Sequence, residues 1–388
     1  MKILLLNLWR VVGSKGGTEK VFFNMANELA EKGYQVTALA MENKEGQPFF
    51  HVAENVNYIN AGVGFEVKFS AWENLWGKLC PDKNKRHMYR DKIVDQQKAA
   101  KLEPIIEKIQ PDIIISYNAE ATRLIKLHTK LKCPVITMFH FNPSHILENC
   151  TMDTKIALSM SECIQVLLPS FIEETRQYIK NKNIVSIANC VPQYNEYNNT
   201  VKKNVIINVG RLDSVQKRQH LLIKAFALIV EQFPDWKIEF WGETDFDEKY
   251  YNYCKSLIKK HHLEKNIAFK GTTNDVIGKL KYAKIFAFPS SFEGFSLALT
   301  EAMSFGLPSI GYQNGISVNE IIIDGKTGYL CADGECALAE ALKKLMLDDD
   351  LREQMGIAAR QEMKKYAPKN IWQQWDELIR EVGLNTTE

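Results

Sequence analysis

The sequence predicts an α/β protein built from two doubly wound domains, each on a parallel sheet. Short apolar runs alternate with segments of helical period along the whole chain, as in βαβ units. One polar, turn-rich stretch, 192–204, interrupts this alternation and has the composition of a linker. A chain of 388 residues also fits two domains of roughly 150–200 residues better than one.

In the first half, apolar runs predict buried strands, namely KILLLNL, YQVTALA, DIIISY, PVITMF and IQVLLPS. Amphipathic segments lie between several of them. In segment 18–31 the apolar side chains share one helical face: Val21, Phe22, Met25, Ala26, Leu29 and Ala30. We therefore predict a first domain over residues 1–200.

Beyond the linker the pattern restarts with VIINVG, WKIEFWG, IFAFPSS and LPSIGY, which predicts a second domain over 201–366. Two such domains are expected to face a central cleft, because ligands favour domain interfaces and the carboxyl ends of strands. The final segment, 367–388, is expected to form a helix that packs back on the first domain through Trp372, Trp375, Leu378 and Ile379.

Composition excludes several classes of protein. The net charge of +2 excludes a broadly basic nucleic-acid binder. The apolar start MKILLLNL is too short for a secretion signal, and no run reaches the roughly 18 apolar residues of a membrane span. The eight cysteines form no CxxC pair, so neither a zinc site nor a disulfide framework is expected. We predict a cytoplasmic protein, at most peripheral to the inner face of the cell membrane.

A glycine loop, GSKGGTEKVFF, follows the first predicted strand. Gly16 and Gly17 allow close backbone approach, and the helix after them offers free amides and a positive dipole end to an anion. An ordinary turn is an equal alternative. A nicotinamide-cofactor loop, with Glu42 holding a ribose, is disfavoured because the G-x-G-x-x-G spacing is not met.

Three cations cluster at the start of the second half, in VGRLDSVQKRQH. Arg211 follows an apolar strand and Gly210 directly, and Lys217 and Arg218 precede a helix. Cations at the carboxyl end of a strand, beside a helix N-terminus, suit a diphosphate. Solvated surface charge is the alternative, which the position of Arg211 argues against.

The segment PSSFEGFSLALTEAMSFGLP carries two carboxylates. Glu293 lies in a loop before Ser296, which is predicted to cap the next helix, and Glu301 lies about two turns into that helix. The helix is apolar on almost every side, so Glu301 needs buried donors, either sugar hydroxyls or an internal cation. Backbone amides are expected to hold phosphate or hydroxyl oxygens at Gly294, Phe295, Ser296 and Leu297.

These motifs, in the order GGTEKV, GRL with a following lysine, AFPSSFEGF and EGFSLALTEAM, resemble retaining glycosyltransferase family four, of the glycosyl transferases group 1. The resemblance spans essentially the whole chain and is densest over 204–330. It implies a GT-B fold of two Rossmann-like domains. It also implies transfer of a hexose or N-acetylhexosamine from a UDP-sugar to a glycan or lipid-linked acceptor, without metal or other cofactor, in the synthesis of bacterial capsule, O-antigen or exopolysaccharide.

By the same resemblance, Arg211 and Lys217 would bind the donor diphosphate, Glu301 the ribose and Glu293 the donor sugar. Gly17 would face the phosphates or the reacting centre, Lys270 would lie in the strand that flanks the base, and His140, after VITMF, would lie near the transferred sugar. A packed, purely structural histidine is the alternative for His140.

The chain departs from the family pattern in three places. The spacing from Arg211 to Lys217 is one residue longer than the commonest pattern, so Arg218 is a second candidate for the role of Lys217. WGETDFDEKY lacks a second glycine, which leaves the contacts to the base open. Its Asp245 and Asp247 are expected to serve as loop or helix-capping residues, not metal ligands.

Segment 65–92 interleaves aromatic and aliphatic residues with basic ones: Trp72, Leu75, Trp76, Leu79, Lys78, Lys83, Lys85, Arg86 and Arg90. Contact with an anionic membrane surface and simple packing on the first domain are equal hypotheses for it. For the function as a whole, the alternatives are a GT-B-fold epimerase or phosphorylase and, less favoured, a nicotinamide-dependent oxidoreductase.

Overall fold

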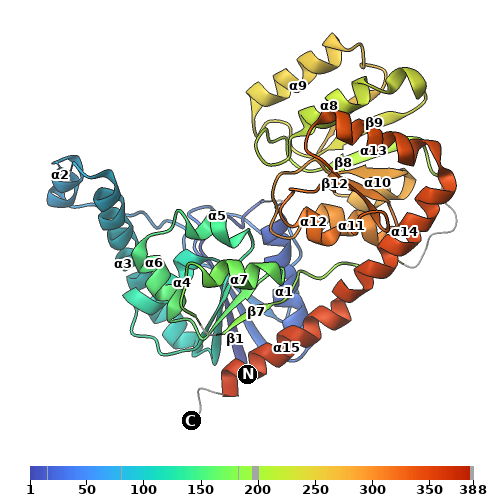
Figure 1. Ribbon diagram of the computed structural model, residues 1–388. Coiled ribbons are helices and arrows are strands. Elements are labelled where there is room, and N and C mark those ends of the chain that lie inside the picture. Colours follow the sequence, from blue (N-terminus) through green and yellow to red (C-terminus); the bar gives the residue numbers. More distant parts are fainter. Residues whose placement is uncertain (15, 80, 182, 195–200, 385–388) are drawn as a thin grey trace. The chain divides into compact units, whose positions relative to one another are not determined.

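The computed structural model describes residues 1–14, 16–79, 81–181, 183–194 and 201–384, which form two units (Figure 1). The first comprises Met1–Ala188 with Trp372–Glu388, and the second comprises Asn189–Ile371. The predicted boundary after residue 200 adjoins 195–200, and the predicted last helix ends in 385–388; both stretches lie outside the described residues.

The first unit is built on a seven-stranded parallel sheet in the order β3-β2-β1-β4-β5-β6-β7. The order reverses between β1 and β4, which makes their carboxyl ends a topological switch point. The strands are β1 (Lys2–Asn7), β2 (Gln35–Ala40), β3 (Val56–Asn60), β4 (Ile113–Ser116), β5 (Val135–Met138), β6 (Cys163–Val166) and β7 (Ile184–Ser186).

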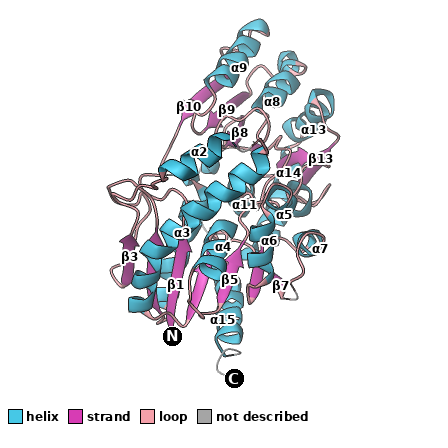
Figure 2. Ribbon diagram, turned by 90° about the vertical axis from the view of Figure 1, so that its left-hand side faces the viewer, coloured by secondary structure: helices cyan, strands magenta, loops and turns pink. Residues whose placement is uncertain are grey.

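Helices cover both faces of this sheet (Figure 2). The helices of the unit are α1 (Gly17–Glu31), α2 (Ala71–Leu79), α3 (Lys83–Ile109), α4 (Ala119–His128), α5 (Pro143–Leu147), α6 (Met152–Ser159) and α7 (Ser170–Arg176), of which α2 lies away from the sheet. The last helix, α15 (Pro368–Leu384), enters the unit at Trp372 and buries its apolar face there. The hydroxyl of Tyr34 donates a hydrogen bond to Asp376 of this helix.

The second unit has a six-stranded sheet in the order β10-β9-β8-β11-β12-β13, with its switch point between β8 and β11. The strands are β8 (Val205–Val209), β9 (Lys237–Trp241), β10 (Ile267–Gly271), β11 (Ile285–Ala287), β12 (Ser309–Tyr312) and β13 (Gly328–Cys331). All of the strand pairs are parallel. The predicted pair of doubly wound parallel sheets is confirmed.

The helices of the second unit are α8 (Gln219–Ala227), α9 (Glu248–Lys260), α10 (Val276–Tyr282), α11 (Leu297–Ser304), α12 (Val318–Ile321), α13 (Glu335–Leu347) and α14 (Asp349–Met363), with 3₁₀ turns Val230–Gln232 and Lys364–Tyr366. One core of the unit joins β8 and β9 with α8, α9 and α13. No described helix in either unit is both long and apolar enough to cross a bilayer.

The central strands match the predicted apolar runs, whereas β3, β7 and β13 were not predicted. All three are edge strands, and only the first residue of each is buried. A half-exposed edge strand carries a mixed sequence, because only part of it faces the core. The apolar-run criterion therefore misses it.

Candidate functional site

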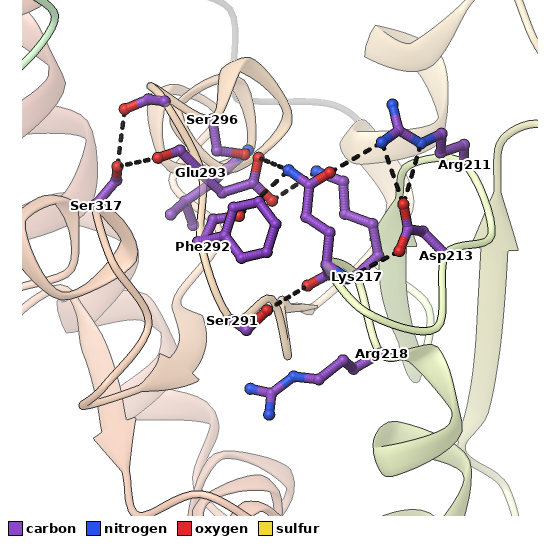
Figure 3. A network of polar contacts seen from close by, with 12 residues as sticks. Arg211, Asp213, Lys217, Arg218, Ser291, Phe292, Glu293, Ser296 and Ser317 are labelled. Carbon is purple, nitrogen blue, oxygen red and sulfur yellow. Dashed lines mark hydrogen bonds and ion pairs between the residues drawn. The ribbon is translucent and has the colours of Figure 1, made fainter. Parts of the chain in front are cut away.

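Two loops at the switch point of the second sheet bring together most of the predicted cationic and acidic residues. The loop after β8 carries Arg211 and Lys217, and the loop after β11 carries Glu293 (Figure 3). At a switch point, the connections after the two neighbouring strands cross to opposite faces of the sheet. Their loops therefore separate, which opens a crevice between them. The predicted residues therefore occupy the place where this type of sheet binds ligands.

Lys217 and Glu293 form a close ion pair at this switch point. The Lys217 Nζ lies 2.6 Å from Glu293 Oε1, and the two side chains are only 14% and 8% exposed. The ammonium also lies 4.9 Å from the centre of the Phe288 ring. Because little water reaches this pair, the attraction between the two charges is stronger than it would be at the surface. The ion pair therefore fixes both side chains in position.

Gln216 links this pair to Arg211. Its Oε1 accepts a hydrogen bond from Arg211 Nη2 at 3.0 Å, and its Nε2 donates to Glu293 Oε2 at 3.2 Å. The side chain is buried, and it also donates to the carbonyl of Phe292. Sequence reasoning missed Gln216, because a glutamine beside a lysine has no pattern of its own; only the contact across 77 positions reveals its role.

Arg211 is held but still accessible. Its guanidinium bonds Asp213 at 3.1 Å and lies 4.5 Å above the Phe246 ring, while the side chain is 42% exposed. Partial burial by itself raises the pKa of Asp213, but hydrogen bonds from the Gln216 amide and from Arg211 outweigh it and lower that pKa below its usual value. Asp213 therefore stays ionised and orients Arg211.

Arg218 points away from this network (Figure 3). Its backbone has φ +49°, and its guanidinium bonds Asp333 at 2.9 Å and the carbonyl of Pro289 at 3.1 Å. It also stacks on Tyr312 at 4.9 Å. The structure thus brings Lys217, and not Arg218, to Glu293. Arg218 instead ties the β8 loop to the loops after β11 and β13.

The loop that carries Glu293 is anchored from two sides. The Ser317 hydroxyl lies 2.7 Å and 2.8 Å from the carbonyl oxygens of Glu293 and Gly294, and the Ser296 hydroxyl accepts from the amide of Leu299 at 3.4 Å. Ser296 is therefore the cap of α11, as predicted. The first amides of α11 have no carbonyl one turn earlier to bond, so this helix end attracts negative charge. Phe295, which directly precedes Ser296, packs edge-on against Tyr366.

Glu301 and Lys270 lie elsewhere in the same unit. Glu301 is buried in α11. The pKa of Tyr194 is raised to about 12, first by the burial of Tyr194 itself and second by the negative charge of Glu301. Lys270 is the second-last residue of β10, and its Nζ lies 3.9 Å from a carboxylate oxygen of Glu239, which also accepts a hydrogen bond from Trp241 Nε1 at 2.9 Å. Asp247 caps α9 by accepting from the Tyr250 amide at 3.0 Å, which confirms its predicted capping role.

In the first unit, His140 and Asn7 lie at the carboxyl ends of β5 and β1. His140 is buried and stacks on Tyr117 at 4.8 Å, and burial lowers its pKa to about 3, so the imidazole is neutral. Among the described residues, His140 Nε2 and Asn7 Nδ2 are buried and have no hydrogen-bond partner. Buried polar atoms are normally paired, so these two atoms are exceptions to the rule.

The carboxylate of Glu19, in helix α1, lies against Gly16 in the glycine loop of the first unit. Gly16 precedes α1, and a methyl group at Gly16 would lie 2.2 Å from a carboxylate oxygen of Glu19. An anion at this helix end would therefore have to displace Glu19. Gly17 is the first residue of α1. The carboxylate of Glu42 accepts from the amides of Val11 and Val12 at 2.7 Å and 2.8 Å, and so braces this loop.

A pocket of about 630 Å³ lies beside this loop, within the first unit. Two aromatic rings line it, Trp9 and Phe141, whose centroids lie 6.1 Å apart. Charged side chains also line it, namely Arg10, Glu19 and Glu42. Aromatic faces with a few polar groups suit a sugar ring, whose hydroxyls bond at its rim while its C–H faces stack. Sequence reasoning missed Trp9, Arg10 and Phe141, which carry no motif.

Comparison with known proteins agrees with this architecture. The family model "Glycosyl transferases group 1" matches residues 193–362. The chain is similar to an uncharacterized glycosyltransferase of Haemophilus influenzae, 26% identical over 379 residues, covering 95% of this chain and 97% of that protein. It is also similar to the N-acetyl-alpha-D-glucosaminyl L-malate synthase of Bacillus anthracis, 24% identical over 397 residues and 95% of each chain.

Solved structures match over the whole length. Sucrose-phosphate synthase from Thermosynechococcus elongatus superposes with a TM-score of 0.79 at 18% identity, covering 100% of both chains. Anabaena HepE in complex with UDP and glucose superposes with a TM-score of 0.72 at 18% identity, covering 98% of this chain and 99% of that one. The chain therefore has the GT-B fold of two parallel-sheet domains, and its residues 193–362 match the family model of the glycosyl transferases group 1.

Proposed function

We propose that this protein is a retaining glycosyltransferase that transfers a hexose or N-acetylhexosamine from a UDP-sugar to a glycan or lipid-linked acceptor. The observation that carries the proposal is the network of Arg211, Gln216, Lys217 and Glu293 at the switch point of the second sheet. It places two cations and one carboxylate on rigid loops within one polar cluster. The matched family and the relatives above supply the class of reaction.

Arg211 and Lys217 bind the donor diphosphate in this proposal, with the amides at the start of α11 beside them. Glu293, fixed by Lys217 and Gln216, accepts hydrogen bonds from the donor sugar's hydroxyls. Glu301 holds the ribose, and Lys270 lies toward the base. Similar solved structures bound to UDP, such as that of Anabaena HepE, support the choice of nucleotide.

The reaction proceeds by front-face attack. The acceptor oxygen forms a bond to the anomeric carbon on the side from which UDP leaves, the bond from that carbon to the β-phosphate oxygen breaks, and the acceptor proton passes to the leaving phosphate. Double displacement needs a carboxylate nucleophile, and the ion pair of Glu293 with Lys217 makes it a weak one. The cations stabilise the charge that develops on the diphosphate.

The first unit binds the acceptor. The rings of Trp9 and Phe141, which line the pocket of this unit, stack an acceptor sugar, and His140 lies near the transferred sugar. A relative from Campylobacter jejuni, 23% identical over 377 residues, is named as an N-acetyl-D-galactosaminyltransferase acting on a PP-undecaprenol glycan. Another, from Erwinia amylovora, is named for amylovoran biosynthesis. Both support a role in bacterial surface polysaccharide synthesis.

The test begins with thermal shifts in UDP-, GDP- and ADP-sugars, because a bound donor stabilises the fold by mass action. UDP release is then measured with and without lipid-linked glycans. We expect stabilisation by a UDP-sugar and acceptor-dependent UDP release that Arg211→Ala or Glu293→Ala nearly abolishes. Isomerisation of the UDP-sugar without acceptor and without net UDP release would instead favour an epimerase. Near-normal rates in both variants would refute the proposed site.

A further inference from the structure

Helix α2 of the first unit presents an apolar face to solvent. Four large side chains recur at positions i, i+3, i+4 and i+7, which places them on one face of the helix. We call this face the α2 patch: Trp72 is 79% exposed, Leu75 45%, Trp76 41% and Leu79 71%. Tryptophan and leucine side chains clustered and exposed to this degree mark a docking surface more often than chance.

The patch is held in place by contacts around it. Ser70 and Glu73 form a reciprocal cap at the start of α2, with the Ser70 amide 2.6 Å from the Glu73 carboxylate and the Glu73 amide 3.2 Å from the Ser70 hydroxyl. The Trp76 ring packs on Tyr89 of α3 at 4.4 Å. The apolar face is therefore presented by an anchored helix, and packing on the first domain leaves Trp72 and Leu79 uncovered.

Basic residues flank the patch along the chain. Segment 65–92 contains seven lysines and arginines against four acidic residues, although the whole chain has a net charge of only +2. Lys68, Lys85 and Lys92 are exposed, whereas the carboxylate of Glu73 is engaged in the helix cap. Arg90 of α3 lies 4.6 Å above the ring of Phe69, and it follows Tyr89, which contacts Trp76 of the patch.

Within its unit, the patch lies far from the sheet. Both views show α3 extending beyond the strands of the first unit and α2 lying at its outer end (Figures 1 and 2).

We propose that the α2 patch docks on a bilayer leaflet that contains anionic lipid, with Trp72, Leu75 and Leu79 in the interfacial region and the surrounding lysines and arginines against the lipid headgroups. Tryptophan favours the boundary between headgroups and acyl chains, and stable peripheral binding needs an apolar and an electrostatic contribution together. A second copy of the chain fits less well, because it would place the two basic rims against each other. The inference goes beyond the proposed function and does not depend on it.

Flotation of the full chain with vesicles tests this directly. Vesicles of phosphatidylcholine alone are compared with vesicles in which about a third of the lipid is phosphatidylglycerol, at low and high salt. We expect the chain to float with the anionic vesicles and to be released by salt. Failure of the wild-type chain to float with them would overturn the proposal.

Matched variants assign the binding to the patch. Trp72→Ser with Leu79→Ser should weaken vesicle binding at least about tenfold. Leu347→Ser with Ile357→Ser, at positions 67% and 58% exposed in the second unit, should not. Lys85→Gln with Lys92→Gln should weaken binding by roughly fivefold for each charge, while Lys259→Gln with Lys260→Gln, also exposed, should not. Thermal unfolding checks that every variant is folded.

Two results would contradict the inference. One is equal weakening by the patch variants and their controls. The other is a wild-type dimer in sedimentation analysis that dissociates in the Trp72→Ser, Leu79→Ser variant without any vesicle binding, which would make a second copy the occupant. Vesicle binding uses neither donor nor acceptor, so either failure leaves the proposed transfer reaction untouched.

Discussion

The Lys217–Glu293 ion pair joins two residues of the candidate site in one buried contact. Two charges that are less than one-sixth exposed have given up most of their hydration, so the pair stabilises the fold little by itself. Removing one partner, however, leaves the other charge buried and unpaired. Arg211, at 42% exposure, belongs to the same network without this constraint. Lys217 and Glu293 are therefore interdependent, and Arg211 is the accessible cation.

Lys217→Ala should lower kcat/KM for the UDP-sugar at least about a hundredfold, because it removes a cation from the leaving diphosphate and frees Glu293 to move. The measurement is acceptor-dependent UDP release. Lys284→Ala is the control. Lys284 also forms an ion pair in this unit, with Asp349, but it lies just before β11, at the amino ends of the strands and away from the candidate site. A comparable loss in both variants would contradict the role of Lys217.

His140 makes the stability of the fold sensitive to acid. Burial lowers its pKa from 6.5 to about 3, so the unfolded chain binds this proton more readily than the folded one between these values. The contribution of His140 to stability is therefore complete above pH 6.5 and falls as the pH drops toward 3.

Between pH 7 and pH 5 the wild type should lose about 2 kcal/mol of unfolding free energy that the His140→Gln variant does not lose. Urea denaturation at several pH values measures this difference in slope. Between pH 7 and pH 8 the two proteins should run parallel, which serves as the internal control. Identical slopes below pH 6.5 would show that His140 is accessible to protons in the folded state.

At the scale of elements, the site depends on how closely the ends of β8 and β9 approach. Gly242 follows β9 with φ +149°, and a methyl group there would lie 2.1 Å from the carbonyl oxygen of Gly210. Gly210 immediately precedes Arg211, and its amide bonds the Trp241 carbonyl at 2.8 Å. A single missing side chain thus sets the path of the loop that carries the site.

Gly242→Ala should destabilise the second unit by about 3 kcal/mol, through backbone strain and displacement of Gly210. It should also reduce donor affinity, measured by the thermal shift in a UDP-sugar. Gly325→Ala separates the two causes, because Gly325 also has positive φ, at +70°, but an added methyl group there meets no atom within 4 Å. That control should cost about 1 kcal/mol and leave donor affinity unchanged. Equal costs would mean that the loop moves aside freely.

At the scale of the whole molecule, two separate segments of the chain form the first unit. The chain leaves that unit after Ala188 and returns to it at Trp372, within α15. The returning part of the helix buries five apolar side chains, Trp372, Trp375, Leu378, Ile379 and Val382, each at most 5% exposed. The part of α15 from Trp372 to Val382 therefore belongs to the core of the first unit.

Trp375→Ala should lower the unfolding free energy of the first unit by about 3–5 kcal/mol, the usual cost of a large core cavity. Calorimetry should show one transition moved to lower temperature and the transition of the second unit unchanged. Gln373→Ala, exposed on the same helix and bonded to Glu377, should change the free energy by less than about 0.5 kcal/mol. An unchanged first transition in Trp375→Ala would mean that α15 is dispensable for the unit.

The sequence alone determined the features that depend on nearby residues. Apolar runs and helical period predicted the central strands and the two parallel sheets, because burial of one strand or helix face imposes a periodicity that is visible in a short window. The caps of α11 at Ser296 and of α9 at Asp247 were predictable for the same reason. The ordered motifs located the residues of the candidate site, whose roles stay predictions.

Only the tertiary structure decided which of these residues meet. Lys217 pairs with Glu293 and Arg218 with Asp333, although the two cations are neighbours in the chain. Gln216 joins Arg211 to Glu293 across 77 positions, and α2 leaves Trp72 uncovered. Contacts between distant segments depend on how the loops pack at the carboxyl ends of the strands. Local propensity contains no information about that packing, because it acts over a few residues, whereas the site is assembled from strands that lie far apart in the chain.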